Sequence, residues 1–386
     1  MRRLGKLLGR PLLAILIVAA VVAVVRREEI ARLVAVNTLF EPDRIVENFS
    51  NMDRLFLHQP LPDGKVGSPL PLGDTIALPK GMQDWMAERL VTSLLVLKDG
   101  VVVFEAYYLG TGPDDQRISW SLAKSFLSAL TGVIIAEGYI EALDDPVTRY
   151  APQLKGTAYD SATVRHVLNM TTGVKFDEDY ADFHSDINRM GRVLALGRLM
   201  DDFAAGLTDT FQPPGEGWQY VSIDTHVLGM VIRGATGRSI IELMGEKITG
   251  PLGLKQTPFY VTDGAGVAFV LGGLNMTTRD YARFGQMIAD GGRWNGVQVV
   301  PLNWIIASTT PSAPTQPGQY GYGYQWWMPE DKRPGEFMGR GIYGQYLYID
   351  SETGIVIVLT AADPEFRDRA VQRENIEWFR QISDSF

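Results

Sequence analysis

The sequence predicts an α/β (α+β) fold: the N- and C-terminal parts of one domain form an antiparallel sheet flanked by helices, and a mostly helical segment is inserted between them. Three observations lead to this prediction. Residues 93–104 contain two apolar runs separated by Asp99-Gly100, which is typical of a β-hairpin with a tight turn. Residues 346–359 show a similar pattern around a short loop at 350–354. Between these hairpins the apolar residues recur mainly with helical spacing.

The composition excludes several classes of function. The chain has 386 residues, long enough for one large domain or two closely packed ones. Its net charge of −9 argues against nucleic-acid binding, which needs clustered Lys and Arg. The absence of cysteine excludes disulfides, thiolate zinc sites and a cysteine nucleophile. Only four histidines occur, and none has the HExxH spacing, so we expect neither a metal nor another cofactor.

The N-terminus predicts a membrane anchor. Residues 1–10 form a basic tail, and residues 11–25 form an uncharged apolar run. As a helix this run spans roughly 22 Å, which suits a signal segment as well as an anchor in a hydrocarbon core of roughly 30 Å. Because residues 21–23 are only a weak cleavage site, we expect anchoring in the bacterial inner membrane, with the remaining chain facing the periplasm or exterior. Secretion after cleavage, or a buried helix in a cytoplasmic protein, are the alternatives.

The rest of the chain divides into two parts. Residues 26–81 are expected to form a partly amphipathic helical segment followed by a Pro/Gly-rich linker. Residues 82–386 are expected to form the main domain, with the helical insertion at about 141–260. The spacing of apolar residues predicts individual helices within that domain at 121–138, 162–170, 225–234 and 368–382.

The first candidate for chemistry is the Ser121-Leu122-Ala123-Lys124 sequence at the start of a predicted helix. Positions i and i+3 share one helix face, so the hydroxyl and the ammonium group meet there. A serine hydroxyl needs a base, and a lysine can supply one only if burial or nearby cations lower its pKa from about 10.4. The apolar neighbours Trp120 and Phe126 suit such burial.

This S-x-x-K pattern is weak evidence by itself, because it occurs by chance about once in a chain of this length. The alternative interpretation is that Ser119 or Ser121 is a helix N-cap and Lys124 lies on a solvated face. A second candidate, Tyr220, precedes another predicted helix. It could relay protons if a neighbouring cation lowered its pKa, or it could be an ordinary core tyrosine.

The third candidate is the glycine-rich sequence Gly339-Arg340-Gly341-Ile342-Tyr343-Gly344. Its letters match the G-x-G-x-x-G dinucleotide fingerprint, but that fingerprint follows a strand and opens a helix. Here the glycines lead into a predicted strand, so the dinucleotide interpretation fails. Glycines in this position instead allow a substrate carbonyl to approach the backbone closely.

In this order, the three motifs resemble the serine β-lactamase and penicillin-binding protein superfamily, and within it the class C β-lactamase-like branch that holds 6-aminohexanoate-dimer hydrolase and related esterases. The resemblance covers roughly residues 82–365 and includes connecting segments such as 143–147, 164–173 and 321–327. It implies a β-lactamase/transpeptidase-like fold and no cofactor.

The resemblance also implies roles for individual residues. Ser121 matches the acylated nucleophile, Lys124 matches the base, and Tyr220 matches the tyrosine of the Tyr-x-Asn element. Ser222 stands where penicillin-directed members usually carry the Asn of that element, and is a candidate substrate contact. The backbone N–H groups of Ser121 and Ile342 match the oxyanion hole.

Two departures from the family pattern affect the expected substrate. The third motif, Lys-Thr-Gly or His-Thr-Gly in the family, is Gly339-Arg340-Gly341 here, and Asn is replaced by Ser222. The family uses that Lys or His for a substrate carboxylate and that Asn for the acyl amide. Arg340 could substitute from the next position, but along a strand its side chain should face the opposite side.

One further candidate is Tyr180, which lies in an acidic loop at 177–182. In the amide-hydrolysing branch, a tyrosine of this loop closes over the substrate. The alternative for Tyr180 is a surface aromatic residue without such a role.

Three hypotheses for function remain. The first is a membrane-anchored serine hydrolase that cleaves a small-molecule amide or ester through an acyl-enzyme on Ser121. The second is a peptidoglycan D-Ala-D-Ala carboxypeptidase or β-lactamase on the same scaffold. The third is a non-catalytic binding or sensing homologue. We favour the first, because Ser121, Lys124 and Tyr220 are intact and the third motif is altered. The oligomeric state is left open.

Overall fold

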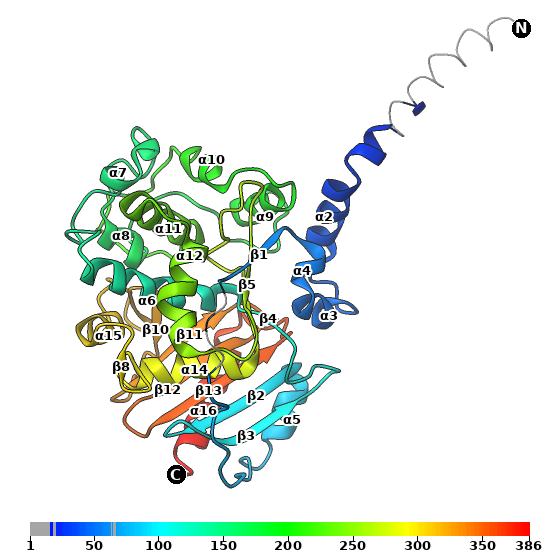
Figure 1. Cartoon of the computed structure of the whole chain (residues 1–386), viewed down its shortest axis with the longest axis vertical. Helices are drawn as coiled ribbons and strands as arrows, with labels where there is room; N and C mark the ends of the chain where they lie inside the picture. Colours follow the sequence, from blue (N-terminus) through cyan, green and yellow to red (C-terminus); the bar gives the residue numbers. More distant parts are fainter. Residues whose placement is uncertain (1–15, 18–20, 63, 65–66) are drawn as a thin grey trace, which may run out of the picture.

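The computed structural model describes residues 16–17, 21–62, 64 and 67–386 (Figure 1). The predicted basic tail and most of the predicted anchor at 11–25 therefore lie outside the described residues. Within the described part of the chain, none of the helices combines the length and the apolar character needed to cross a bilayer.

A seven-stranded antiparallel sheet forms the centre of the main domain, with strand order β3-β2-β13-β12-β11-β10-β9. Both predicted hairpins are present, because β2 pairs with β3 and β12 with β13. Asp99 and Gly100 form the first turn with positive φ angles of 49° and 79°. The strands are β2 (Val91–Lys98), β3 (Val101–Tyr107), β9 (Gly321–Gly323), β10 (Trp326–Met328), β11 (Glu336–Gly341), β12 (Gln345–Asp350) and β13 (Ile355–Ala361).

Helices cover both faces of this sheet, which explains why its central strands are apolar at almost every position. Alternate residues belong to different clusters: Leu95 packs toward the helical part of the molecule, and Leu94 packs toward the opposite face. The helices α6 (Ala123–Ala136) and α14 (Thr278–Ala289) lie on the first face, and α5 (Met82–Glu88) and α16 (Arg369–Ser383) lie on the second (Figure 1). The predicted helix at 368–382 is thus present.

The helical part lies between β3 and β9 in the sequence and is longer than the predicted insertion at about 141–260. It includes the predicted helices at 162–170 and 225–234, shifted by a few residues. Its helices are α7 (Val147–Tyr150), α8 (Val164–Asn169), α9 (Asp186–Ala195), α10 (Met200–Ala205), α11 (Ser222–Thr236), α12 (Ile240–Met244), α13 (Gly250–Leu252) and α15 (Leu302–Ser308), with short helical turns at Trp120–Leu122, Pro152–Leu154 and Gly245–Thr249.

Two smaller strand groups were not predicted. A four-stranded sheet has the order β1-β5-β6-β4 and joins the N-terminal segment to the domain, because β1 pairs with β5. Its strands are β1 (His58–Pro60), β4 (Arg117–Ile118), β5 (Phe259–Val261) and β6 (Leu274–Met276), and a separate hairpin consists of β7 (Arg293–Trp294) and β8 (Val297–Gln298). These strands are two or three residues long, and strands this short show no alternating pattern from which they could be predicted.

The N-terminal segment is helical as predicted, but its role is larger than that of a linker. Helices α2 (Arg27–Thr38), α3 (Ile45–Ser50) and α4 (Met52–Leu55) lie against the domain, with α2 beside α9 (Figure 1). Phe49 is fully buried in the main core, and the Arg117 guanidinium donates to the Val46 carbonyl at 2.6 Å. Residues 27–61 therefore pack against the domain that is expected to begin at Met82.

This packing predicts a stability effect. Phe49→Ala is expected to lower the free energy of unfolding by about 3–5 kcal/mol, because it removes a fully buried aromatic side chain and leaves a cavity. Denaturant unfolding of the purified protein measures this loss. The matched control is Ile30→Ala, because Ile30 of α2 is 44% exposed. This substitution should change the free energy of unfolding by less than about 0.5 kcal/mol. Equal effects of the two substitutions would contradict the structural role of this segment.

Candidate active site

Ser121 lies on a tight turn between β4 and α6. It is the middle residue of the one-turn helix Trp120–Leu122, which continues directly into α6. The preceding residue, Trp120, has a φ of 44°, in the left-handed region that bulky residues rarely adopt. Phe40 and Phe49 of the N-terminal segment pack against the Trp120 ring, with centroid distances of 5.5 and 5.4 Å. This packing holds the strained turn that presents Ser121.

Lys124 lies one helical turn after Ser121, and the structure brings the two side chains together. The Lys124 Nζ donates to the Ser121 Oγ at 3.1 Å and to the Leu271 carbonyl at 2.7 Å. The Lys124 side chain is only 1% exposed. Burial lowers its pKa to about 7, since desolvation disfavours the ammonium form. The burial of Lys124 agrees with the prediction that the site must desolvate this lysine. The alternative, in which Lys124 lies on a solvated helix face, is excluded.

Tyr220 precedes α11 and hydrogen-bonds to the Ser121 side chain. Its ring stacks on Trp327 at a centroid distance of 5.3 Å, and the Lys124 Nζ lies 5.4 Å from the ring centroid. A neighbouring cation, Arg340, does lower the pKa of Tyr220, but burial and the negative charge of Glu178 outweigh it and raise this pKa well above 10. Tyr220 is therefore a neutral phenol, which can donate a proton but is a poor base.

The glycine-rich motif lies beside the Ser121 turn and leads directly into a strand, β12, as predicted, while its first residues also end the preceding strand, β11. Gly339 and Gly341 are within β11, and Ile342 begins the turn to β12. A Cβ atom on Gly341 would lie 2.4 Å from the Ser119 carbonyl oxygen, so only glycine allows this approach. Ile342 lines the same cavity as Ser121.

Arg340 points away from Ser121, as the alternation along a strand predicts. Its guanidinium carbon lies 4.8 Å from the Tyr320 ring centroid, 5.1 Å from that of Trp327 and 5.6 Å from that of Tyr346. These cation–π contacts hold the guanidinium behind Trp327. Arg340 is therefore poorly placed to replace the missing Lys or His of the third motif.

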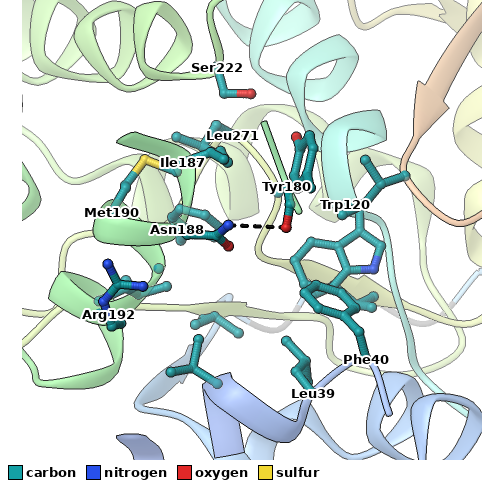
Figure 2. Close-up of a pocket in the computed structure, with 18 of the residues that line it drawn as sticks. Leu39, Phe40, Trp120, Tyr180, Ile187, Asn188, Met190, Arg192, Ser222 and Leu271 are labelled. Carbon is teal, nitrogen blue, oxygen red and sulfur yellow. Dashed lines mark hydrogen bonds between the residues drawn. The ribbon is translucent and has the colours of Figure 1, made fainter. Parts of the chain in front are cut away.

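A cavity of about 280 Å³ opens beside Ser121, and it contains both predicted substrate contacts, Tyr180 and Ser222 (Figure 2). Tyr180 stands at one wall, and its carbonyl accepts from the Asn188 side-chain amide at 3.1 Å. Ser222 is the first residue of α11, is buried, and faces the cavity from the side opposite Leu39. Of the predicted site residues, Ser121, Tyr180, Ser222 and Ile342 line this cavity. Lys124 and Tyr220 contact the Ser121 side chain but do not line the cavity.

Glu178 is a residue of this site that the sequence analysis did not single out. Its carboxylate accepts from the Ser222 backbone N–H and from the Tyr180 hydroxyl, the latter at 3.2 Å. Burial raises its pKa and the charge of Lys124 opposes this, while Glu178 in turn raises the pKa of Lys124. Only tertiary packing distinguishes Glu178 from the other acidic residues of its loop.

The Glu178–Lys124 pair predicts a change in the pH profile. Deprotonation of Lys124 should produce the acid limb of kcat/KM, with activity rising as pH increases through about 7. Glu178→Gln removes a negative charge that stabilises the ammonium form, so the limb should move to lower pH. Kinetics on a chromogenic ester between pH 5 and 9 measure the shift. A loss of activity with no shift would show that Glu178 only positions Tyr180 and Ser222.

Two histidines of the helical part have partners other than the predicted site residues. His226 contacts Asp201 at 2.8 Å, and His166 pairs with Thr163 at the N-terminus of α8. Both have structural partners within the helical part. Over the described ranges, no cluster of three or more His, Cys, Asp or Glu side chains is arranged to hold a metal ion.

The fold, the turn that carries Ser121 and the adjoining cavity can be compared with those of known protein families. The sequence profile of the Beta-lactamase family matches residues 81–377, and the chain belongs to this family. It is a serine hydrolase with the β-lactamase fold. The resemblance found in the sequence motifs is thereby confirmed at the level of the family.

Individual relatives place the chain within the family. It is 32% identical to 6-aminohexanoate-dimer hydrolase of Paenarthrobacter ureafaciens over 298 residues, which are 74% of this chain and 76% of that protein. It is 29% identical to esterase EstB of Burkholderia gladioli over 36% of this chain and 37% of that protein. The solved structure named "Putative 6-aminohexanoate-dimer hydrolase from Bacillus anthracis" superimposes with a TM-score of 0.78 at 24% identity, covering 89% of this chain and 95% of that one.

Proposed function

We propose that this protein hydrolyses carboxylic esters and unhindered amides through an acyl-enzyme on Ser121. One observation carries the proposal: the Ser121 Oγ lies 3.1 Å from the Nζ of a buried lysine whose pKa is lowered to about 7. Near neutral pH a large fraction of Lys124 is then unprotonated and can take the hydroxyl proton. The relatives named for ester and amide hydrolysis support the same class of substrate.

Acylation begins when the Ser121 Oγ attacks the carbonyl carbon and its proton passes to the Lys124 Nζ. The backbone N–H groups of Ser121 and Ile342 are the donors that we assign to the resulting oxyanion. Ser121 lies in the first turn of a helix, so the helix dipole also favours negative charge at this point.

Collapse of the tetrahedral intermediate expels the leaving group, which needs a proton unless it is a weak base. We assign this donation to Tyr220, whose neutral hydroxyl hydrogen-bonds to the Ser121 side chain. Lys124, protonated in the first step, then returns the proton to Tyr220. Water completes the reaction by attacking the acyl-enzyme, with the same groups acting in the reverse order.

The preference for esters and amides over β-lactams rests on two missing contacts. Gly339 provides no side chain for a substrate carboxylate, and Arg340 is held on the far side of β11. Loss of one charge-assisted hydrogen bond to that carboxylate forfeits roughly 1.5–3 kcal/mol, or about ten- to a hundredfold in kcat/KM.

This reasoning predicts a substrate ranking. The kcat/KM for p-nitrophenyl butyrate should exceed that for nitrocefin, and hydrolysis of a linear aminohexanoate dimer should be weak or absent relative to the ester. Parallel steady-state assays of the three compounds, with Ser121→Ala as the blank, measure it. If nitrocefin were the best substrate by a wide margin, the carboxylate reasoning would be wrong, and the protein would act as a β-lactamase.

We also propose that residues 11–25 anchor the protein in the inner membrane, with the hydrolase outside the cytoplasm. The proposal rests on the apolar run and its basic N-terminal flank in the sequence. Fractionation of cells that express the full chain tests it, together with N-terminal sequencing. Recovery in the membrane fraction with residues 1–25 retained supports an anchor, whereas a mature N-terminus after residue 23 shows cleavage.

A further inference from the structure

The cavity beside Ser121 is apolar over most of its surface, and the N-terminal segment supplies one of its walls. Val36 and Leu39, from α2 and its end, line the cavity together with Ile187 and Met190 of α9. Figure 2 shows Leu39 on one side and Ile187 and Met190 on another. Leu271 closes it near the nucleophile. A site lined in this way takes an apolar group, because polar atoms placed there lose their water without gaining partners.

The cavity lies on the acyl side of the scissile bond. Ser121 and Ile342 line it, but Tyr220 does not, because its ring stacks against Trp327 instead. In the reaction proposed above, the leaving group departs toward Tyr220. The substituent that enters the cavity is therefore the acyl chain, which stays attached to Ser121 after the first step.

The polar side chains that line the cavity offer no negative charge to a cation. The Asn37 amide donates to the Leu33 carbonyl at 2.7 Å, and the Asn188 amide donates to the Asp182 carbonyl at 2.7 Å. Arg192 is itself a cation and lies over the Phe183 ring at 3.9 Å. None of the described residues that line the cavity is an Asp or a Glu. The nearby Glu178 already accepts hydrogen bonds from Ser222 and Tyr180.

We infer that the cavity selects a neutral alkyl acyl chain and discriminates against an acyl chain that ends in an ammonium group. This inference rests on the proposed acyl transfer at Ser121 and specifies its substrate class. An ω-ammonium group would lose its hydration next to apolar walls and be repelled by Arg192, whereas methylene groups gain from burial. The chain thus differs in expected preference from a hydrolase of aminohexanoate dimers.

The experiment compares three p-nitrophenyl esters that share one leaving group: acetate, hexanoate and 6-aminohexanoate, assayed at pH 7.5. Hexanoate has four more methylene groups than acetate, and each one that is buried contributes roughly fourfold, so hexanoate should exceed acetate in kcat/KM by about ten- to a few hundredfold. Hexanoate should exceed 6-aminohexanoate, which has the same chain length, by at least about tenfold. Equal or better hydrolysis of 6-aminohexanoate would overturn the inference, as would equal rates for hexanoate and acetate.

A substitution at Gly191 tests whether this cavity is the source of the preference. Gly191 lines the cavity on α9, and a Cβ atom there would lie 3.6 Å from the Val36 Cγ2. Gly191→Leu should therefore fill the space and reduce the hexanoate-to-acetate ratio by at least about tenfold. Val36→Phe, from the facing wall, should reduce it in the same direction if Gly191→Leu does not fold. The matched control is Gly112→Leu, at a glycine with nothing within 4 Å of an added Cβ. An unchanged ratio in both cavity variants would overturn the assignment.

A binding measurement separates failure of this inference from failure of the proposed function. Hexanamide and 6-aminohexanamide are titrated calorimetrically into Ser121→Ala, which needs no turnover. Tighter binding of hexanamide supports the cavity preference even if the wild-type protein hydrolyses none of the esters, in which case only the proposed reaction fails. Tighter binding of 6-aminohexanamide would overturn the preference even if ester hydrolysis depends on Ser121.

Discussion

Replacement of Lys124 by alanine is expected to lower kcat on p-nitrophenyl butyrate by at least about a thousandfold. The Ser121 hydroxyl contacts the Lys124 Nζ at 3.1 Å, and burial keeps the pKa of that amine near 7. Removal of the amine removes the group that accepts the hydroxyl proton during attack. Ser121 and Lys124 take part in one proton transfer. Replacing either residue should therefore lower kcat about as much as replacing both.

The control for this variant is Lys155→Ala, which removes an exposed lysine outside the site. It should leave kcat within about twofold of the wild type. Circular dichroism and thermal unfolding of Lys124→Ala separate a folding defect from a chemical one, because the truncated side chain was fully buried. A folded Lys124→Ala enzyme with a near wild-type kcat would exclude Lys124 as the base.

The second large effect is expected from Tyr220→Phe, and its size should depend on the leaving group. Tyr220 is a neutral, buried phenol hydrogen-bonded to the Ser121 side chain, which suits proton donation. An alkyl ester or an amide needs that proton, so the substitution should lower kcat by about a hundred- to a thousandfold. The leaving group of a p-nitrophenyl ester is p-nitrophenolate, a weak base that needs no proton. The substitution should therefore lower kcat on this ester much less.

The comparison uses ethyl butyrate and p-nitrophenyl butyrate, which form the same acyl-enzyme. Wild-type and Tyr220→Phe enzymes are assayed on both at the same pH, with rates on the ethyl ester followed by acid release. The ratio of the two losses is the readout. Equal losses on both esters would indicate that Tyr220 positions Ser121 or stacks on Trp327 rather than donating a proton.

Much of the fold and the site follows from local patterns in the sequence. In both hairpins, β2–β3 and β12–β13, the strand residues are apolar either alternately or throughout, and they flank a recognisable turn. Both hairpins were therefore predictable. Ser121 and Lys124 lie one helical turn apart, so their meeting was predictable as well. Their approach to Tyr220 was inferred by resemblance, because nothing local to residue 220 indicates which helix it faces.

Other features depend on contacts between distant segments, which no local pattern records. The pKa of Tyr220 rises because it is enclosed by the helical part and lies near Glu178, whereas the sequence suggested a cationic neighbour that would lower it. The N-terminal helices were predicted, but nothing in their sequence indicates what they contact. In the structure, α3 and the segment that joins it to α2 pack beneath Trp120. The acyl cavity exists only because these segments meet α9.

The most direct test of the central claim is to identify the residue that becomes acylated. The protein is mixed with p-nitrophenyl butyrate, quenched in acid within milliseconds to seconds, and analysed by intact mass and peptide mapping. A fluorophosphonate adduct is mapped in parallel. We predict a single butyryl or phosphonyl group on Ser121 that forms at the rate of the p-nitrophenol burst and is absent from Ser121→Ala. A modification at another residue that forms at the same rate, or sustained turnover by Ser121→Ala, would contradict the assignment of Ser121 as the nucleophile.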